Sequence, residues 1–145
     1  MFNPDRAITW FVLGQLYREV PGWPVSFGNT EAAVSLGRKA VDLNTSPVDD
    51  GNFQVELAKM LYQRNWSAAQ RLSEQQNMAA KLPGVGTTFE KASLFEATVS
   101  LKDQSDREEA KSIVQEVIAT MEALPDLTAS QIRDLRKAKE VFAKW

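Results

Sequence analysis

The sequence predicts an all-α domain of antiparallel helix pairs, and three observations lead to that prediction. Apolar residues recur at steps of three and four along most of the chain, which is the period of an amphipathic helix. Prolines, glycines and capping side chains divide the chain into about seven such segments. No stretch shows convincing alternation of apolar and polar residues, which a half-buried strand would require. At 145 residues the chain fits a single domain over residues 1–145.

The first two helices are expected at about residues 4–19 and 30–44. Asn3 can cap the first helix, and Pro4 suits its first position because proline lacks the N–H that would be unpaired there. Residues 20–28 hold two prolines and two glycines and cannot continue a helix. The two helices are therefore expected to form a hairpin.

Five further helices follow from the same periodicity and from their start and stop signals. Pro125 ends the sixth helix, and Thr128 with Gln131 forms a capping box that opens the last one. The last helix carries one apolar stripe and is expected to cap the array, with its basic residues keeping it soluble. The five helices are expected at about residues 48–64, 67–82, 88–101, 106–124 and 128–145.

Composition excludes several function classes. The formal charge of −2 and the pI of about 5.2 argue against a nucleic-acid partner. Because the chain has no cysteine and no histidine, it cannot form the usual zinc sites, disulfides or Ser-His and Cys-His pairs. Residues 82–88 are glycine-containing but lack the lysine and the preceding strand of a phosphate-binding loop. We therefore expect no enzyme activity, no catalytic residue, no metal and no cofactor.

Membrane insertion by this segment is not expected, and its compartment stays open. The apolar run over residues 7–13 is short, has no positively charged region before it and no cleavage site after it, so it does not look like a signal peptide. A signal or anchor could have been lost with an upstream segment. A lack of cysteine is compatible with both the cytoplasm and the bacterial periplasm.

The first hairpin resembles a tetratricopeptide repeat. Trp10, Leu13, Gly14 and Tyr17 have the spacing W-x2-L-G-x2-Y, and Ala33 lies in the helix that follows. Gly14 and Ala33 are small where the two helices would approach closely. The resemblance implies degenerate repeats at about residues 7–47, 48–83 and 88–124, stacked as a short superhelix with residues 128–145 as the capping helix.

The first unit also departs from the family pattern. Gly37 stands where an aromatic residue is usual, and about seven extra residues separate the two helices. The extra segment contains Trp23 and Phe27, which either brace the first hairpin or form a secondary partner contact. We favour bracing, because two exposed aromatic side chains would create a patch that monomers usually avoid.

The resemblance implies a non-catalytic scaffold that binds a protein or peptide in a concave groove. Arg18, Lys59 and Lys102 give this groove a modest preference for acidic peptides, which the nearby Glu19 and Asp103 reduce. The same residues could instead be ordinary solvated or core residues of a short array. By spacing, the groove positions are Phe11, Gln15, Arg18, Asn52, Val55, Lys59, Tyr62, Phe95, Val99 and Lys102.

A second and weaker likeness gives an alternative function. The arrangement is similar to the helical T-component of TRAP transporters, which implies a periplasmic accessory subunit that handles a small ligand or docks a binding protein. A closed apolar pore or a deep pocket lined by Phe11, Phe95 and Val99 would support this alternative over an open peptide groove.

Overall fold

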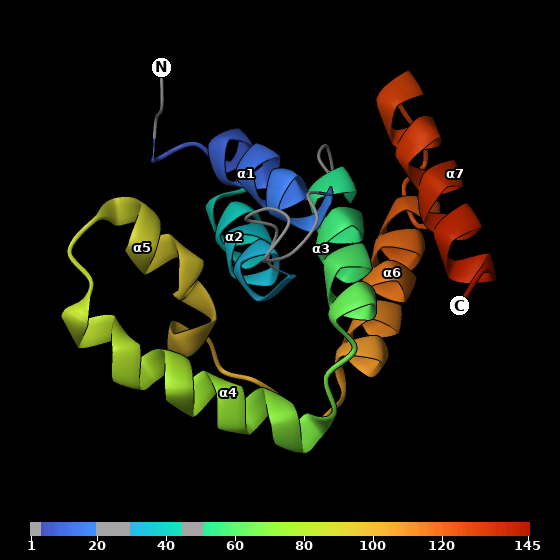
Figure 1. Cartoon of the computed structure of the whole chain (residues 1–145). Helices are drawn as coiled ribbons and strands as arrows, with labels where there is room; N and C mark the ends of the chain where they lie inside the picture. The colour runs from blue at the N-terminus through green and yellow to red at the C-terminus, as the bar shows by residue number, and fades with distance from the viewer. Residues whose placement is uncertain (1–3, 20–29, 45–50) are drawn as a thin grey trace.

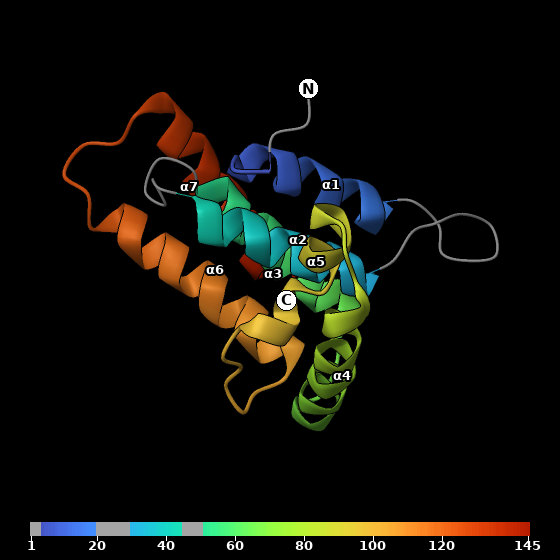
Figure 2. The ribbon, with the colours of Figure 1, turned by 90° about the vertical axis from the view of Figure 1, so that its left-hand side faces the viewer.

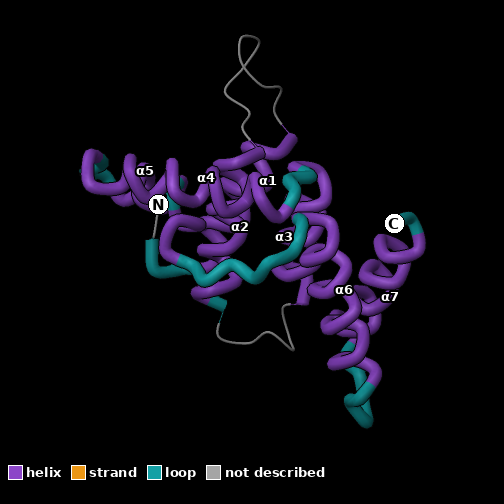
Figure 3. Tube along the Cα trace, turned by 90° about the horizontal axis from the view of Figure 1, so that it is seen from below, coloured by secondary structure: helices purple, strands orange, loops and turns teal. Residues whose placement is uncertain are grey.

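The computed structural model describes residues 4–19, 30–44 and 51–145, and every regular element in these residues is helical (Figure 3). This confirms the predicted all-α class. Two short 3-10 helices, η1 (Leu82–Gly84) and η2 (Phe95–Thr98), accompany the α-helices. The α-helices are α1 (Ala7–Glu19), α2 (Thr30–Leu43), α3 (Gly51–Arg64), α4 (Ala68–Lys81), α5 (Thr88–Ser93), α6 (Asp106–Glu122) and α7 (Ala129–Ala143).

Four of these helices begin with the same local device. In each capping box, the hydroxyl of the capping residue accepts a hydrogen bond from the backbone N–H three residues later, and that later side chain accepts one in return. The predicted box of Thr128 and Gln131 at the start of α7 is confirmed. The other three boxes are Ser67 with Gln70, Thr87 with Glu90, and Ser105 with Glu108.

The first hairpin forms as predicted, and glycine makes its close packing possible. A Cβ atom on Gly14 would lie 3.3 Å from the carbonyl oxygen of Ala33 and 3.3 Å from the backbone nitrogen of Gly37. A Cβ atom on Gly37 would lie 2.8 Å from Sδ of Met60 in α3. The absence of side chains at Gly14 and Gly37 therefore allows α1 to pack closely on α2 and allows Met60 of α3 to contact both glycines.

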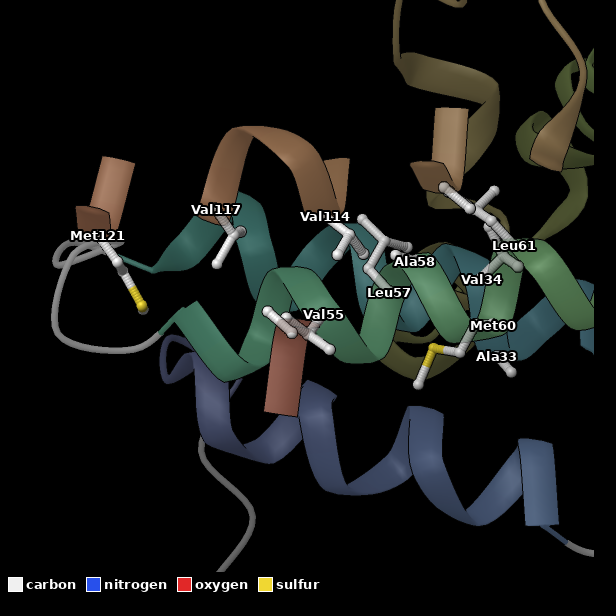
Figure 4. Packing of buried hydrophobic residues seen from close by; sticks show 12 residues of the cluster. Ala33, Val34, Val55, Leu57, Ala58, Met60, Leu61, Val114, Val117 and Met121 are labelled. Carbon is white, nitrogen blue, oxygen red and sulfur yellow. The ribbon is translucent and has the colours of Figure 1, made fainter. Parts of the chain in front are cut away.

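The helices α1, α2, α3, α6 and α7 pack in that order, each against the next (Figure 1). The main core lies between α2, α3 and α6, where Val34, Leu61 and Val114 are fully buried (Figure 4). A second cluster around Trp10 and Leu36 joins α1 to α2 and reaches Ala92 of α5. Helix α7 lies at one end of this row and packs mainly on α6.

The second and third predicted helix pairs are wrong, so the tetratricopeptide-like stacking is not confirmed. The main partner of α3 is α6, whereas α4 packs mainly on η1 and η2 at the periphery of the molecule (Figures 1 and 2). The physical reason is the supply of apolar surface. Helix α6 buries Val114, Val117 and Met121 against the core, whereas Met78 is the only apolar side chain that α4 buries completely.

The predicted helix over residues 88–101 is also shorter than expected. It ends at Ser93, and η2 follows. The backbone around Glu96 instead bonds to other elements. The Glu96 N–H donates to Oγ of Ser35 at 3.2 Å, and Nε2 of Gln75 donates to the carbonyl oxygens of Glu96 at 2.9 Å and Val99 at 2.6 Å. Tertiary hydrogen bonds thus replace those that a longer helix would have made.

Candidate functional site

Six charged side chains meet in the interior where α4 and η2 join the rest of the molecule. Three are arginines and three are carboxylates, so their formal charges cancel. Four of them, Arg64, Arg71, Glu96 and Asp106, have side chains no more than 1% exposed. With Arg38 and Glu109 they form what we call the arginine–carboxylate cluster, contributed by α2, α3, α4, η2 and α6.

Arg64 and Arg38 connect the carboxylates of this cluster. Arg64 donates to Glu96 at 2.7 Å through Nη1 and to Asp106 at 2.7 Å through Nε. Arg38 donates to both carboxylate oxygens of Glu109, at 2.9 and 2.8 Å, and to Glu96 at 2.6 Å. Paired donors of this kind fix the orientation of both groups, because the guanidinium fork matches the carboxylate.

Arg71 brings α4 into the same cluster. Its guanidinium donates to Glu109 and, at 3.0 Å, to the carbonyl oxygen of Ser105.

Burial would lower the pKa of Arg64, but hydrogen bonds and attraction from Asp106 and Glu96 outweigh burial and raise it. Burial would likewise raise the pKa of Glu109, but hydrogen bonds from Arg38 and the attraction of nearby arginines lower it. The three positive and three negative charges balance, so the cluster links α4 and η2 to the rest of the molecule.

The acidic members of the cluster do not provide a metal site. In the described ranges, no three acidic side chains are grouped as a metal ion would need. The carboxylates of Glu96, Asp106 and Glu109 face arginines instead. The chemistry of the cluster is therefore ionic packing.

A surface depression of about 310 Å³ lies over α1, α3 and Trp145, which follows α7. Three of the residues that line it, Arg18, Lys59 and Tyr62, were predicted groove positions. We call it the α1–α3 depression. Its lining consists of Arg18, Glu19, Lys59, Tyr62, Gln63 and Trp145.

One buried carboxylate holds the cations beside the depression. Glu56 is 1% exposed and accepts hydrogen bonds from Arg18 at 2.6 Å and from Lys59 at 3.0 Å. Nζ of Lys137 lies 3.2 Å from the same carboxylate. Burial would raise the pKa of Glu56, but the hydrogen bonds from Arg18 and Lys59 prevail and lower it to about 2. Glu56 is thus ionised at neutral pH and attracts three cations.

Aromatic rings form another part of the depression. Tyr62 and Trp145 stack with their ring planes 3° apart and their centroids separated by 4.4 Å. The guanidinium carbon of Arg107 lies 4.3 Å from the centroid of the Tyr62 ring. Contacts of this kind hold flat rings in place beside polar groups.

The other predicted groove residues do not join this surface. The prediction of Phe11 and Val55 as groove residues is wrong, because both side chains are buried in the core. The ring of Phe11 packs on that of Phe53, with 4.6 Å between the ring centroids. Phe95 begins η2 and Val99 caps its C-terminal end, and η2 packs on α2 and α4. The predicted continuous groove over the first helix of each of the three repeats therefore does not form.

The remaining predicted positions have separate surroundings. Lys102 is exposed in the segment after η2, and Gln15 is partly exposed on α1. Asn52 accepts a hydrogen bond from Lys137 at 2.9 Å, and so it lies near the cations of the depression. The interpretation of Trp23 and Phe27 falls on residues outside the described ranges.

Sequence reasoning missed both the arginine–carboxylate cluster and Glu56. The available signal was a charge on the apolar face of a helix. Arg64 continues the face of Leu57 and Leu61 at a step of three, yet a charged residue at the end of a helix normally indicates exposure. Only the partners from other elements explain its burial.

A mainly apolar cavity of about 380 Å³ opens between α2, α3 and α6. Val41, Leu57, Ile113 and Val117 are among its lining residues. Its lining does not include Phe11, Phe95 or Val99, so the predicted composition of a ligand pocket is not found there.

No protein-family model, curated protein or solved structure matches the chain. None of the helices in the described part of the chain is both long enough and apolar enough to cross a membrane.

Proposed function

We propose that this protein is a non-catalytic scaffold module that binds a segment of another protein at the α1–α3 depression. The observation that carries the proposal is the combination of the stacked pair Tyr62 and Trp145 with Arg18 and Lys59 in one open hollow. Aromatic and arginine side chains are enriched at protein interfaces, where they contribute much of the binding energy.

The way these side chains are held also supports the proposal. Arg18 is fixed by the buried Glu56, and the ring of Tyr62 is fixed by Trp145 and Arg107. Less conformational entropy is lost on binding when the contact groups are already ordered. The depression therefore presents a stacked pair of aromatic rings beside cationic hydrogen-bond donors, all of which are already ordered before a partner binds.

Site-specific photo-crosslinking in the native organism tests the proposal. A photoreactive amino acid replaces Gln63, which is exposed and lines the depression, and a matched variant carries it at the exposed Lys91 of α5. We expect a protein adduct at position 63 that mass spectrometry identifies, and no such adduct at position 91. Equal adducts at both positions, or none at position 63, would contradict the proposed site.

A second candidate function is that of an accessory subunit that handles a small ligand, as the likeness to the T-component implies. The apolar cavity between α2, α3 and α6 favours it, because about 380 Å³ falls in the range of small-molecule sites. Native mass spectrometry after incubation with an extract of the organism tests it. A bound mass that disappears when Ile113→Trp fills the cavity would support this function, and an unliganded wild-type protein would argue against it.

A further inference from the structure

We infer that the α1–α3 depression receives a side-chain carboxylate of an acidic partner segment, in the place that Glu19 of the same chain occupies in the unbound protein. This inference rests on the proposed function and names the chemistry of the partner. It is carried by the unequal roles of the two carboxylates that contact Arg18.

The two carboxylates differ in burial. Glu56 has a side chain 2% exposed and shares its charge among Arg18, Lys59 and Lys137, so its role is structural. Glu19 has a side chain 67% exposed, and its contact with Arg18 is formed at the protein surface. Exposed ion pairs contribute little to stability, so solvent or another carboxylate can replace Glu19 at small cost.

The edge of Arg18 that Glu19 covers is suited to an incoming acid. Nε of Arg18 donates to Oε1 of Glu19 at 2.7 Å, and Nη2 approaches the same oxygen. These two nitrogens form the parallel pair of donors with which an arginine binds a carboxylate side by side. Glu19 uses only one oxygen there, so it leaves the two-oxygen contact unmade.

The charge balance favours an acidic partner over a basic or neutral one. Three cations, Arg18, Lys59 and Lys137, surround one buried carboxylate, and Glu19 supplies one further negative charge. Displacing Glu19 leaves the cations with two unmatched positive charges. Lys59 uses one of its three N–H groups in its described hydrogen bond, and it lines the depression beside Arg18.

Two capped peptides separate this inference from a general affinity for peptides. The probes are acetyl-Gly-Ser-Glu-Leu-Gly-amide and its counterpart with Gln in place of Glu, so neither has a terminal charge. Binding is followed by NMR titration of the whole chain, through the indole N–H signal of Trp145 assigned with the Trp145→Phe variant.

Glu19→Gln removes the internal competitor and should tighten binding of the Glu peptide about two- to fivefold. The matched control is Glu122→Gln, which removes an equally charged, exposed and ion-paired carboxylate on α6. This control should leave the affinity within error of the wild type. Lys59→Gln should weaken binding about two- to fivefold, whereas Lys139→Gln, which removes the partner of Glu122, should not.

Three results would overturn the inference. They are no perturbation of Trp145 by the Glu peptide, equal binding of the Gln peptide, or equal gains in Glu19→Gln and Glu122→Gln, which would show a net-charge effect alone. The proposed function fails separately, through the crosslinking at position 63. A crosslinked partner whose capture is unchanged in Glu19→Gln and Lys59→Gln would keep the binding surface and remove its preference for acids.

Discussion

Glu96 and Glu122 both pair with cations, but their different burial should make their contributions to stability very different. Glu96 is fully buried between Arg38 and Arg64, whereas Glu122 forms an exposed pair with Lys139. Glu96→Gln leaves three arginines facing two carboxylates, so one buried positive charge loses its compensation. We expect this to lower the free energy of unfolding by about 3 to 5 kcal/mol. Urea unfolding followed by circular dichroism measures this change.

The matched substitution Glu122→Gln should change the unfolding free energy by about 1 kcal/mol or less. Comparable losses of unfolding free energy in the two variants would mean that water reaches the arginine–carboxylate cluster and screens its charges. That result would remove its role as the joint between α4, η2 and the core.

Glu56 gives the protein a predictable response to acid. Its pKa is lowered from 4.5 to about 2, so its charged form is favoured by folding. The resulting stabilisation is fully present above about pH 4.5 and is lost as the pH falls toward 2, because the unfolded chain then binds the proton first. We expect the melting temperature to fall between pH 4.5 and pH 2.

Glu56→Gln isolates this contribution. The variant should be less stable than the wild type at pH 7, because Arg18 and the two lysines lose their shared carboxylate. The difference in melting temperature should narrow as the pH approaches 2. A constant difference over this range would show that Glu56 is not the titrating group.

At the scale of elements, the contact between α1 and α2 depends on the missing side chain of Gly14. Glycine is less favourable than alanine in a helix interior by about 0.8 to 1 kcal/mol, and leucine ranks close to alanine, so propensity alone would make Gly14→Leu stabilising. The backbone atoms of Ala33 and Gly37 lie only 3.3 Å from the place of a Cβ atom and cannot move independently. We therefore expect a net loss of about 1 to 3 kcal/mol.

Gly86→Leu is the control for that substitution. A Cβ atom at Gly86 meets no other atom within 4 Å, so the same change should alter the unfolding free energy by about 0.5 kcal/mol or less. If Gly14→Leu were as mild as Gly86→Leu, the helices would not cross at Gly14.

At the scale of the whole molecule, the partner of α3 decides the architecture. Leu72 on α4 is 43% exposed, whereas Val114 on α6 is fully buried against the core. A helix pair of α3 with α4 would bury Leu72. We expect Val114→Asp to prevent folding or cost more than about 4 kcal/mol, because it buries an unpaired charge, and Leu72→Asp to cost about 0.5 kcal/mol or less.

Thermal unfolding of the two variants distinguishes these architectures. Strong destabilisation by Leu72→Asp would restore the pairing of α3 with α4 that the repeat pattern predicted. A folded Val114→Asp variant would contradict the packing of α6 in the core.

Local signals in the sequence predicted most of the helices and the first hairpin, although the helix that begins at Thr88 is shorter than predicted. The capping pair Thr128 and Gln131 and the stop at Pro125 act within a few residues, so they could be recognised without knowing the fold. Gly14 and Ala33 could be recognised as a contact because they belong to helices adjacent in the chain. The repeat resemblance, not a local signal, named Arg18, Lys59 and Tyr62 as groove positions, and these three residues line the α1–α3 depression.

The tertiary structure alone decided which distant elements meet. The repeat pattern assigned α3 to α4, but the larger apolar surface of α6 made it the partner of α3. Arg64, Glu96 and Asp106 come from α3, η2 and α6, and their charges are buried because each supplies the partner that the others need. Burial of a charge depends on partners remote in sequence, so periodicity within one helix could not reveal it.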